Sequence, residues 1–241
     1  MPFRQFCLTV WQRINDRQDE WRVVKGLYNA IDYNIRRQYK NMKIFEYGQK
    51  ELDYLKRRDK KLGEAIDKIG MIKREIIPDP FKALISSIVS QQISKKAAET
   101  VQHRLNTLLR HITPENITQT DLIEIQGCGM SLRKAGYIKG IADEAIAGTV
   151  DFKTLSTLTD EEIIKKLSSF HGVGVWTAEM LLIFSLGRPD VVSHKDLAIC
   201  RGMMNLYGLK ELPKDKFERY RKRYSPYGSV ASLYLWALSV M

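Results

Sequence analysis

Two glycines stand directly before a helix-forming run in the segment FHGVGVWTAEM, residues 170–180. Gly172 and Gly174 suit a tight corner between helices, because glycine adopts positive φ angles without steric cost. The same spacing suits an anion site, because the first amides of a helix lack backbone acceptors and glycines let a phosphate approach them. Short glycine turns are common, so this segment alone favours the corner and leaves the anion site open.

A carboxylate follows this turn in the segment DVVSHKDLAIC, where Asp196 stands at the expected start of a helix. A side chain at that position can cap the helix. It can also supply a negative charge for chemistry, and the positive end of the helix favours the ionised form. The local sequence leaves both roles open.

Three further segments place polar or aromatic residues at expected helix junctions. Gln91 and Gln92 follow the apolar run FKALISSIVS. The segment GCGMSLRKAGYIKG, residues 127–140, combines a glycine turn, a serine and several basic residues. The segment SPYGSVASLYLW, residues 225–236, places Tyr227 before the last helix-forming run. Each pattern is ordinary by itself, because such residues also cap helices or pack in cores.

Helical periodicity dominates from about residue 50 onward, so helices are expected to position these residues. Asp79 and Pro80 have the types found at an N-cap and the first helical position. Ser94 can cap the next helix, and Thr159 with Glu162 forms a capping box. Strand alternation is scarce, which predicts an all-α fold of about ten short helices. In the helix over residues 95–109, the side chains expected to face inward are Ala97, Ala98, Val101, Leu105 and Leu108.

The composition indicates a folded protein with a polyanionic partner. Of the 241 residues, 44% are hydrophobic, and 39 Lys and Arg against 28 Asp and Glu give a net charge of +11. Such a surplus favours nucleic acid or an anionic membrane surface. Because no apolar run approaches the ~18 residues of a spanning helix, we expect nucleic acid, no membrane partner and a cytoplasmic, nucleoid-associated location.

The cysteines and histidines predict neither a disulfide framework nor a metal centre. The three cysteines, Cys7, Cys128 and Cys200, lie far apart, and the four histidines form no ligand pattern. Residues 1–41 are a polar, basic N-terminal extension, and the sequence leaves open whether they fold, pack loosely or precede the true start. Residues 42–241 are expected to form the helical domain.

Taken together, the quoted segments resemble the helix-hairpin-helix DNA glycosylases of the HhH-GPD superfamily, and within them the 3-methyladenine DNA glycosylases of type II. The resemblance covers roughly residues 80–240. The family hairpin L-P-G-V/I-G-x-W-T-A aligns with residues 170–178, where Phe170 replaces the leucine and His171 stands where proline is usual. The family aspartate falls on Asp196. The junction glutamines and the C-terminal aromatic residue of the family fall on Gln91, Gln92 and Tyr227.

The resemblance implies a two-lobed all-α glycosylase fold, with the active-site cleft between the lobes and without the added β domain of some relatives. It implies base excision repair by a monomer that acts on double-stranded DNA containing a damaged base. Such an enzyme flips an alkylated purine out of the stack, hydrolyses its N-glycosidic bond and leaves an abasic site.

The resemblance also implies roles for individual residues. Asp196 is the expected catalytic residue, which stabilises positive charge on the deoxyribose and orients the water. Trp176 and Tyr227 are expected to attract the cationic base through their rings. Met180 and Leu197 stand where the family has two further pocket aromatics, which leaves the preferred alkylated base open.

Other residues are expected to contact DNA. Gln92 is the candidate for filling the gap that the flipped base leaves, with Gln91 beside it. One phosphate is expected on the amides of Gly172 and Gly174 and the hydroxyl of Thr177. The resemblance implies no cofactor except a monovalent cation, Na⁺ or K⁺, on the hairpin carbonyls of Phe170 and Gly172. The residues that resemble the family's second phosphate contact are Gly129, Ser131 and Lys134.

Two alternatives stay open at this point. Lyase-competent relatives carry a nucleophilic lysine where this chain has Trp176, which argues for simple hydrolysis. Lys195, beside Asp196, nevertheless leaves open a bifunctional oxidised-purine glycosylase and lyase. The second alternative is a non-catalytic DNA-binding protein that kept only the hairpin.

Overall fold

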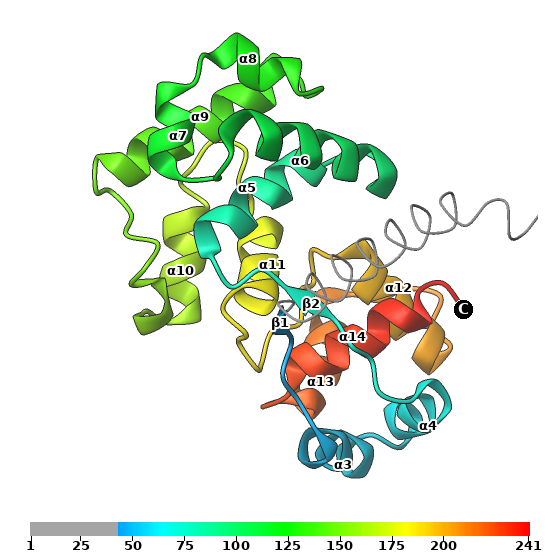
Figure 1. Cartoon of the computed structure of the whole chain (residues 1–241). Helices are drawn as coiled ribbons and strands as arrows, with labels where there is room; N and C mark the ends of the chain where they lie inside the picture. The colour runs from blue at the N-terminus through cyan, green and yellow to red at the C-terminus, as the bar shows by residue number, and fades with distance from the viewer. Residues whose placement is uncertain (1–42) are drawn as a thin grey trace, which may run out of the picture. The chain divides into compact units, whose positions relative to one another are not determined.

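The computed structural model describes residues 43–241 (Figure 1), so the predictions for residues 1–41 lie outside the described residues. The described range contains twelve α-helices, one short 3₁₀-helix and one pair of two-residue strands. The α-helices are α3 (Gln49–Arg58), α4 (Lys60–Ile69), α5 (Pro80–Ser90), α6 (Lys95–Leu109), α7 (Pro114–Gln119), α8 (Leu122–Gly127), α9 (Leu132–Ile146), α10 (Asp160–Leu167), α11 (Val175–Phe184), α12 (Leu197–Tyr207), α13 (Lys214–Tyr224) and α14 (Gly228–Leu238). The all-α prediction is confirmed.

The strands β1 (Lys43–Ile44) and β2 (Glu75–Ile76) pair antiparallel, with Lys43 opposite Ile76. The twelve α-helices of the described range are slightly more than the expected ten or so, and two pairs of them follow each other almost without a break. Asp59 separates α3 from α4, and Thr120 with Asp121 separates α7 from α8.

Within residues 43–241, no helix combines the length and the apolarity that crossing a bilayer requires.

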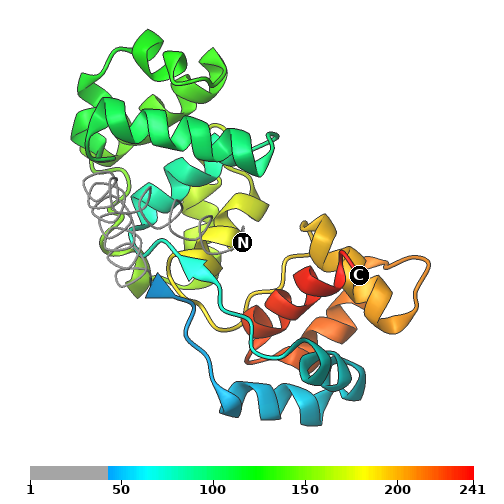
Figure 2. The same cartoon turned by 45° about the vertical axis from the view of Figure 1, so that its right-hand side comes forward.

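The helices pack in two sets. In the first set, α5 packs against α6, α9 and α11, α9 also contacts α7 and α8, and α10 packs on α11. In the second set, α12 and α14 pack on each other and on α4, and α3 contacts α4, α13 and α14. Figures 1 and 2 show the two sets as separate groups of ribbons, with α5–α11 in one group and α3, α4 and α12–α14 in the other.

Side chains at the N-cap positions fix where several helices begin. Asp79 accepts the amide of Lys82 at 3.0 Å at the start of α5, with Pro80 at the first helical position. Ser94 accepts the amide of Ala97 at 3.3 Å at the start of α6. These predicted caps are confirmed, as is the reciprocal capping box of Thr159 and Glu162 at α10.

The inward face of α6 differs from the prediction. Val101, Leu105 and Leu109 are buried, whereas Leu108 is 37% exposed and Ala97 is exposed. The buried residues repeat every four positions, so α6 presents one narrow stripe to its neighbours. The predictions for Ala97 and Leu108 were wrong because the first turn of the helix and its flank extend beyond the core.

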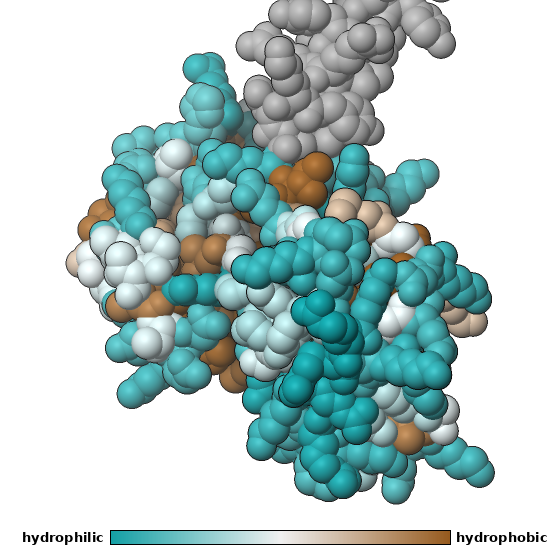
Figure 3. Space-filling model, turned by 90° about the horizontal axis from the view of Figure 1, so that it is seen from below, coloured by the Kyte–Doolittle hydropathy of each residue, from teal (hydrophilic) through white to brown (hydrophobic). Residues whose placement is uncertain are grey.

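A glycine allows α12 to approach α14 closely. A Cβ atom at Gly202 would lie 1.9 Å from the backbone oxygen of Leu235, which no real side chain tolerates. The two helices therefore meet backbone to backbone at this point. Because Asp196 stands at the N-terminus of α12, this contact helps to fix the position of its carboxylate. On the face shown in Figure 3, hydrophilic residues predominate.

Candidate functional site

The carboxylate of Asp196 is almost completely buried and has three N–H donors. The residue is 6% exposed and caps α12, because Oδ1 accepts the amides of Ala198 and Ile199, both at 2.9 Å. The second oxygen, Oδ2, accepts a hydrogen bond from Nε1 of Trp176 at 2.8 Å. The capping role and a contact with the hairpin helix are therefore combined in one side chain.

Trp176 joins this carboxylate to a cavity. It lies in the first turn of α11 and is 39% exposed. The cavity has a volume of about 360 Å³, and the described residues that line it are Ser87, Ser90, Gln91, Gln92 and Trp176. Its volume falls in the range of pockets that bind small molecules. Trp176 thus lines the cavity and also holds Asp196 through its indole nitrogen.

The turn after α5 contains a strained residue that lines this cavity. Gln92 is exposed and has a φ of +56°, one of two non-glycine residues with positive φ among those described. A long side chain in the left-handed region costs on the order of 1–3 kcal/mol and persists where the surrounding structure requires it. The strain marks this turn as a candidate for function and not only for connection.

Gln91 ties this turn to two other segments. Its side-chain Nε2 donates to the carbonyl of Gly172 at 3.0 Å. Its own carbonyl accepts a hydrogen bond from the ammonium of Lys134 at 2.5 Å. The turn after α5, the glycine hairpin and the start of α9 are therefore connected through one residue.

The two hairpin glycines have different reasons to be glycine. Gly172 has a φ of +83°, and a Cβ atom there would lie 2.2 Å from the ring of Tyr137 on α9. The fold itself requires this glycine. Gly174 has a φ of −95°, which any residue adopts, and a Cβ atom there would meet nothing within 4 Å. The fold alone does not explain the glycine at position 174.

Gly174 lies at the N-terminus of α11, where the backbone is open. It provides no side-chain cap, and the first helical amide with a backbone partner is that of Ala178, which donates to the Gly174 carbonyl at 3.1 Å. The amides of Val175, Trp176 and Thr177 have no acceptor among the described residues. A missing side chain and unpaired amides are the features that let an anion approach a helix start.

The expected monovalent cation was placed on the carbonyls of Phe170 and Gly172. In the structure the Phe170 carbonyl accepts the amide of Val173 at 3.2 Å, and the Gly172 carbonyl accepts the side chain of Gln91. Each carbonyl has two lone pairs, so one acceptor position stays available on each, and neutral oxygen donors fit such an ion. The cation stays a prediction. In the described range, no cluster of three His, Cys, Asp or Glu side chains could hold a metal ion.

The lysine of the second predicted phosphate contact, Lys134, faces backbone carbonyls. Gly129 has a φ of +108°, and Ser131 caps α9 by accepting the amide of Lys134 at 3.3 Å. The ammonium of Lys134 lies 3.0 Å from the carbonyl of Val89 as well as on Gln91, and burial lowers the pKa of this lysine. Lys134 therefore caps the C-terminal end of α5. A phosphate contact through its ammonium would require the side chain to leave these carbonyls.

Four other predicted site residues lie apart from the cavity at Trp176. Tyr227 is half-buried and packs edge-on against Tyr54 of α3, with ring centroids 5.1 Å apart. Met180 is buried in the core, and Leu197 is 80% exposed in the first turn of α12. Thr177 is only 3% exposed. None of these four is among the described residues that line the cavity.

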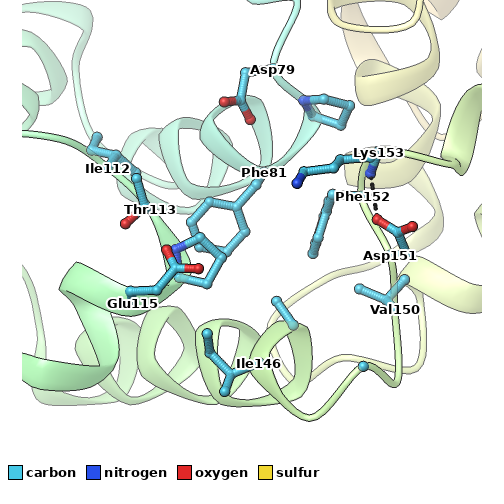
Figure 4. Close-up of a pocket in the computed structure, with 14 residues that line it drawn as sticks. Asp79, Phe81, Ile112, Thr113, Glu115, Ile146, Val150, Asp151, Phe152 and Lys153 are labelled. Carbon is cyan, nitrogen blue, oxygen red and sulfur yellow. Dashed lines mark hydrogen bonds between the residues drawn. The ribbon is translucent and has the colours of Figure 1, made fainter.

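A larger cavity of about 580 Å³ lies between the starts of α5 and α7 and the end of α9 (Figure 4). Two buried phenylalanines, Phe81 and Phe152, form part of its wall, with ring centroids 5.3 Å apart. Two of its three carboxylates, Asp79 and Asp151, have structural partners: Asp79 caps α5, and Asp151 accepts the amide of Lys153 at 2.9 Å. This cavity includes no predicted site residue.

The structure adds one residue to the site that the sequence did not indicate. Glu179 lies one helical turn after Trp176, and its Oε2 accepts a hydrogen bond from the hydroxyl of Ser193 at 2.5 Å. Burial raises the pKa of Glu179, and the negative charge of Asp196 raises it further, whereas the Ser193 hydrogen bond and Lys195 lower it. The available signal was a single charged residue in the mostly apolar helix VWTAEMLLIF.

The open hairpin lies at the start of a helix, and the site also contains a buried carboxylate and a cavity lined by a tryptophan. Together with the basic composition, these features define a helix-hairpin-helix protein that binds nucleic acid. The chain belongs to the HhH-GPD superfamily of base excision DNA repair proteins, whose family model matches residues 85–226.

The chain is also similar in sequence and structure to individual DNA glycosylases. DNA-3-methyladenine glycosylase 1 of Schizosaccharomyces pombe is 36% identical over 67% of this chain and 73% of its own. DNA-3-methyladenine glycosylase of Saccharomyces cerevisiae is 31% identical over 68% of each chain. The crystal structure of DNA-3-methyladenine glycosidase from Bacillus halodurans has a TM-score of 0.73 at 35% identity and covers 82% of this chain and 93% of its own. The S. pombe 3-methyladenine DNA glycosylase in complex with abasic DNA has a TM-score of 0.72 at 31% identity, with coverages of 80% and 98%.

Proposed function

We propose that this protein is a monofunctional DNA glycosylase that hydrolyses the N-glycosidic bond of alkylated purines of the 3-methyladenine type. Relatives that are named 3-methyladenine glycosylases, and the likeness to one such protein in complex with abasic DNA, support this activity. The observation that carries it is the 2.8 Å hydrogen bond between Trp176 and Asp196 at the edge of a cavity.

Asp196 is the catalytic residue of this proposal. Breaking the N-glycosidic bond builds positive charge on the deoxyribose, and a fixed carboxylate beside the sugar stabilises that charge. The amides of Ala198 and Ile199 and the indole of Trp176 hold the carboxylate in one orientation. The same group can orient the attacking water.

The substrate class follows from the chemistry of the base. An alkylated purine of this type is cationic, so it leaves without strong acid catalysis, and an indole ring attracts it by about 0.5–2 kcal/mol more than a neutral base. Trp176 provides such a ring in the cavity wall. Tyr227, Met180 and Leu197 have no contact that assigns them a pocket role, so their place in the base pocket stays a prediction.

The cleft is proposed to lie between the two sets of helices. Trp176 belongs to α11 of the first set, whereas Asp196 begins α12 of the second set. Their hydrogen bond bridges the sets. A flipped base that reaches Trp176 would therefore have its sugar near the start of α12.

DNA is proposed to contact the surface beside this cleft. The amides after Gly174 would hold one phosphate, and Gly129 with Ser131 would approach a second. The strained turn would insert the side chain of Gln92 into the space that the flipped base leaves. We expect a monomer on double-stranded DNA that carries a damaged base, in a cytoplasmic, nucleoid-associated setting.

No observation favours the bifunctional alternative. Trp176 occupies the position of the lyase lysine and is bound to Asp196. Lys195 is exposed, and the contact that it makes within the described residues is from its backbone amide to Ser193 at 3.2 Å.

Mass spectrometry of the bases that the full-length protein releases from methylated duplex DNA tests the proposed function. We expect free 3-methyladenine or 7-methylguanine, intact abasic strands and no covalent adduct after borohydride treatment. Borohydride trapping would support the lyase instead. Tight binding to abasic DNA without any base release would support the non-catalytic alternative.

A further inference from the structure

We infer that Glu179 is a positioning residue for Asp196, acting through Ser193, and this inference rests on the proposed function. Two side chains one turn apart on α11 reach the same short segment before α12. Trp176 binds Asp196 at 2.8 Å, and Glu179 binds Ser193 at 2.5 Å. Glu179 therefore gives α11 a second attachment to this segment, three residues before Asp196.

Ser193 transmits the contact through its backbone and hydroxyl. The residue is completely buried. Its hydroxyl donates to Glu179 and accepts the amide of Lys195 at 3.2 Å, while its carbonyl accepts the amide of Asp196 at 3.3 Å. A displacement of Glu179 therefore changes the turn that leads directly into the catalytic carboxylate.

The charge of Glu179 indicates that its role is more than packing. The carboxyl is half-buried and is the one charged group on α11. The charged groups that influence it, Asp196 and Lys195, both come from the segment that it holds, and burial with Asp196 makes its ionised form unfavourable. An apolar residue or a glutamine would be less costly there. An ionised acceptor, however, makes a shorter and stronger hydrogen bond to a hydroxyl than a neutral one.

Four variants of the full-length protein test this inference: Glu179→Gln, Glu179→Ala, Ser193→Ala and the double variant Glu179→Ala with Ser193→Ala. Single-turnover release of 7-methylguanine from methylated DNA is the readout, with abasic-DNA affinity measured in parallel. Glu179→Ala and Ser193→Ala are expected to slow release by about 10–100-fold, because sub-ångström to 1 Å misplacement of a catalytic group costs this much. Affinity for abasic DNA should not change. The double variant should be no slower than the slower single variant, since both remove one connection.

Two further readouts separate positioning from a merely structural role. Wild-type release should fall on the acid side where Glu179 takes up its proton, and Glu179→Gln should lack that part of the profile. Glu179→Gln should also be at least as stable as wild type to denaturant. Release rates equal to wild type in the Glu179 and Ser193 variants would overturn the inference, as would rates that fall only in proportion to unfolded protein.

A matched control keeps this test separate from the test of the proposed function. Glu144 is an exposed glutamate on α9, so Glu144→Gln makes the same chemical change away from the site. If wild type and Glu144→Gln both release the base and the Glu179 variants are equally fast, only the inference on Glu179 fails. If wild type releases no alkylated base, the proposed function fails together with it.

Discussion

Asp196 shows how one carboxylate can serve folding and chemistry together. Its Oδ1 caps α12 and its Oδ2 binds Trp176. A capping carboxylate is held without side-chain freedom, so a group that must face one sugar atom is well placed at a helix start. The cap and the proposed catalytic role do not exclude each other.

The nitrogen of Trp176 can be tested apart from its ring. Trp176→Phe removes the Nε1–H donor to Asp196 and keeps an aromatic face in the cavity. We expect single-turnover excision to fall by about 10–100-fold, because a hydrogen bond to a charged group contributes about 1.5–3 kcal/mol. Excision that is unchanged in Trp176→Phe but lost in Trp176→Ala would assign Trp176 to base stacking alone.

The two hairpin glycines form a matched pair of variants. Gly172→Ala should reduce the free energy of unfolding by about 2 kcal/mol or more, because its φ is +83° and its Cβ would strike Tyr137. Gly174→Ala should change the free energy of unfolding by less than about 1 kcal/mol, since its backbone is ordinary and its surroundings are empty.

Affinity for abasic DNA is expected to show the effect of Gly174→Ala, which stability does not. In Gly174→Ala the added methyl group stands where a phosphate would approach the amides, so abasic-DNA affinity should fall by about tenfold. Denaturant unfolding and DNA titration measure the two effects. Unchanged affinity in Gly174→Ala would remove the helix start of α11 from the DNA-binding surface.

The raised pKa of Glu179 predicts a pH dependence of stability. The native state holds this proton at pH values where the unfolded chain has lost it, so the ionised carboxyl destabilises the native state. The destabilisation is absent below the unfolded pKa of about 4.3 and complete above the raised native pKa. The free energy of unfolding of wild type relative to Glu179→Gln should therefore decrease as the pH rises from 4 toward neutral. The size of this decrease is proportional to the difference between the native and unfolded pKa of Glu179. Parallel stability curves for the two proteins would contradict this expectation.

Contacts between residues distant in sequence set the limit of prediction at this level. Gly172, Gly174 and Asp196 became candidates because their segments, taken together, match the spacing of a family motif. Glu179 did not, because its partner Ser193 lies fourteen residues away and no local pattern joins them. The engagement of Lys134 with the end of α5 was equally invisible, since the carbonyls that hold it lie more than forty residues earlier.

Among the secondary-structure elements, local signals predicted where helices begin better than which faces they bury. The caps at Asp79, Ser94 and Thr159 are each completed within three residues and were therefore readable from the sequence. The choice between Leu108 and Leu109 on α6 depends on which neighbouring helices cover it, which the periodicity of one helix does not determine.

The contact between α12 and α14 offers a test of how the fold positions Asp196. Gly202→Ala places a methyl group against the Leu235 carbonyl and should cost about 3 kcal/mol in the free energy of unfolding, at the upper end for overpacking. It should also slow excision in the protein that stays folded, because α12 must shift and Asp196 moves with it. Gly136→Ala is the control, since a Cβ atom at that helical glycine meets nothing within 4 Å. Wild-type stability in Gly202→Ala would contradict the close approach of the two helices.

For the described molecule as a whole, the family and the net charge lead to the same partner, but the charge does not locate the contact surface. The surplus of +11 favoured nucleic acid. Lys134 and Lys139 nevertheless direct their ammonium groups to backbone carbonyls, Lys139 to those of Thr118 and Thr120 at 3.0 and 2.7 Å. The proposed contact surface rests instead on neutral amides at the start of α11, which bind phosphate without reading sequence.

Single-turnover excision of 7-methylguanine by Asp196→Asn, alongside abasic-DNA binding, decides whether this helical fold is an enzyme with its chemistry at α12. Asparagine can still cap a helix, but its single side-chain oxygen cannot serve both α12 and Trp176, and it carries no charge. Asp79→Asn makes the same change at the cap of α5 and controls for replacing a capping aspartate by asparagine. We predict that Asp196→Asn folds and binds abasic DNA but excises the base about 10²–10⁴-fold more slowly, while Asp79→Asn keeps wild-type excision. Excision at the wild-type rate by folded Asp196→Asn would contradict the assignment of the reaction to this carboxylate.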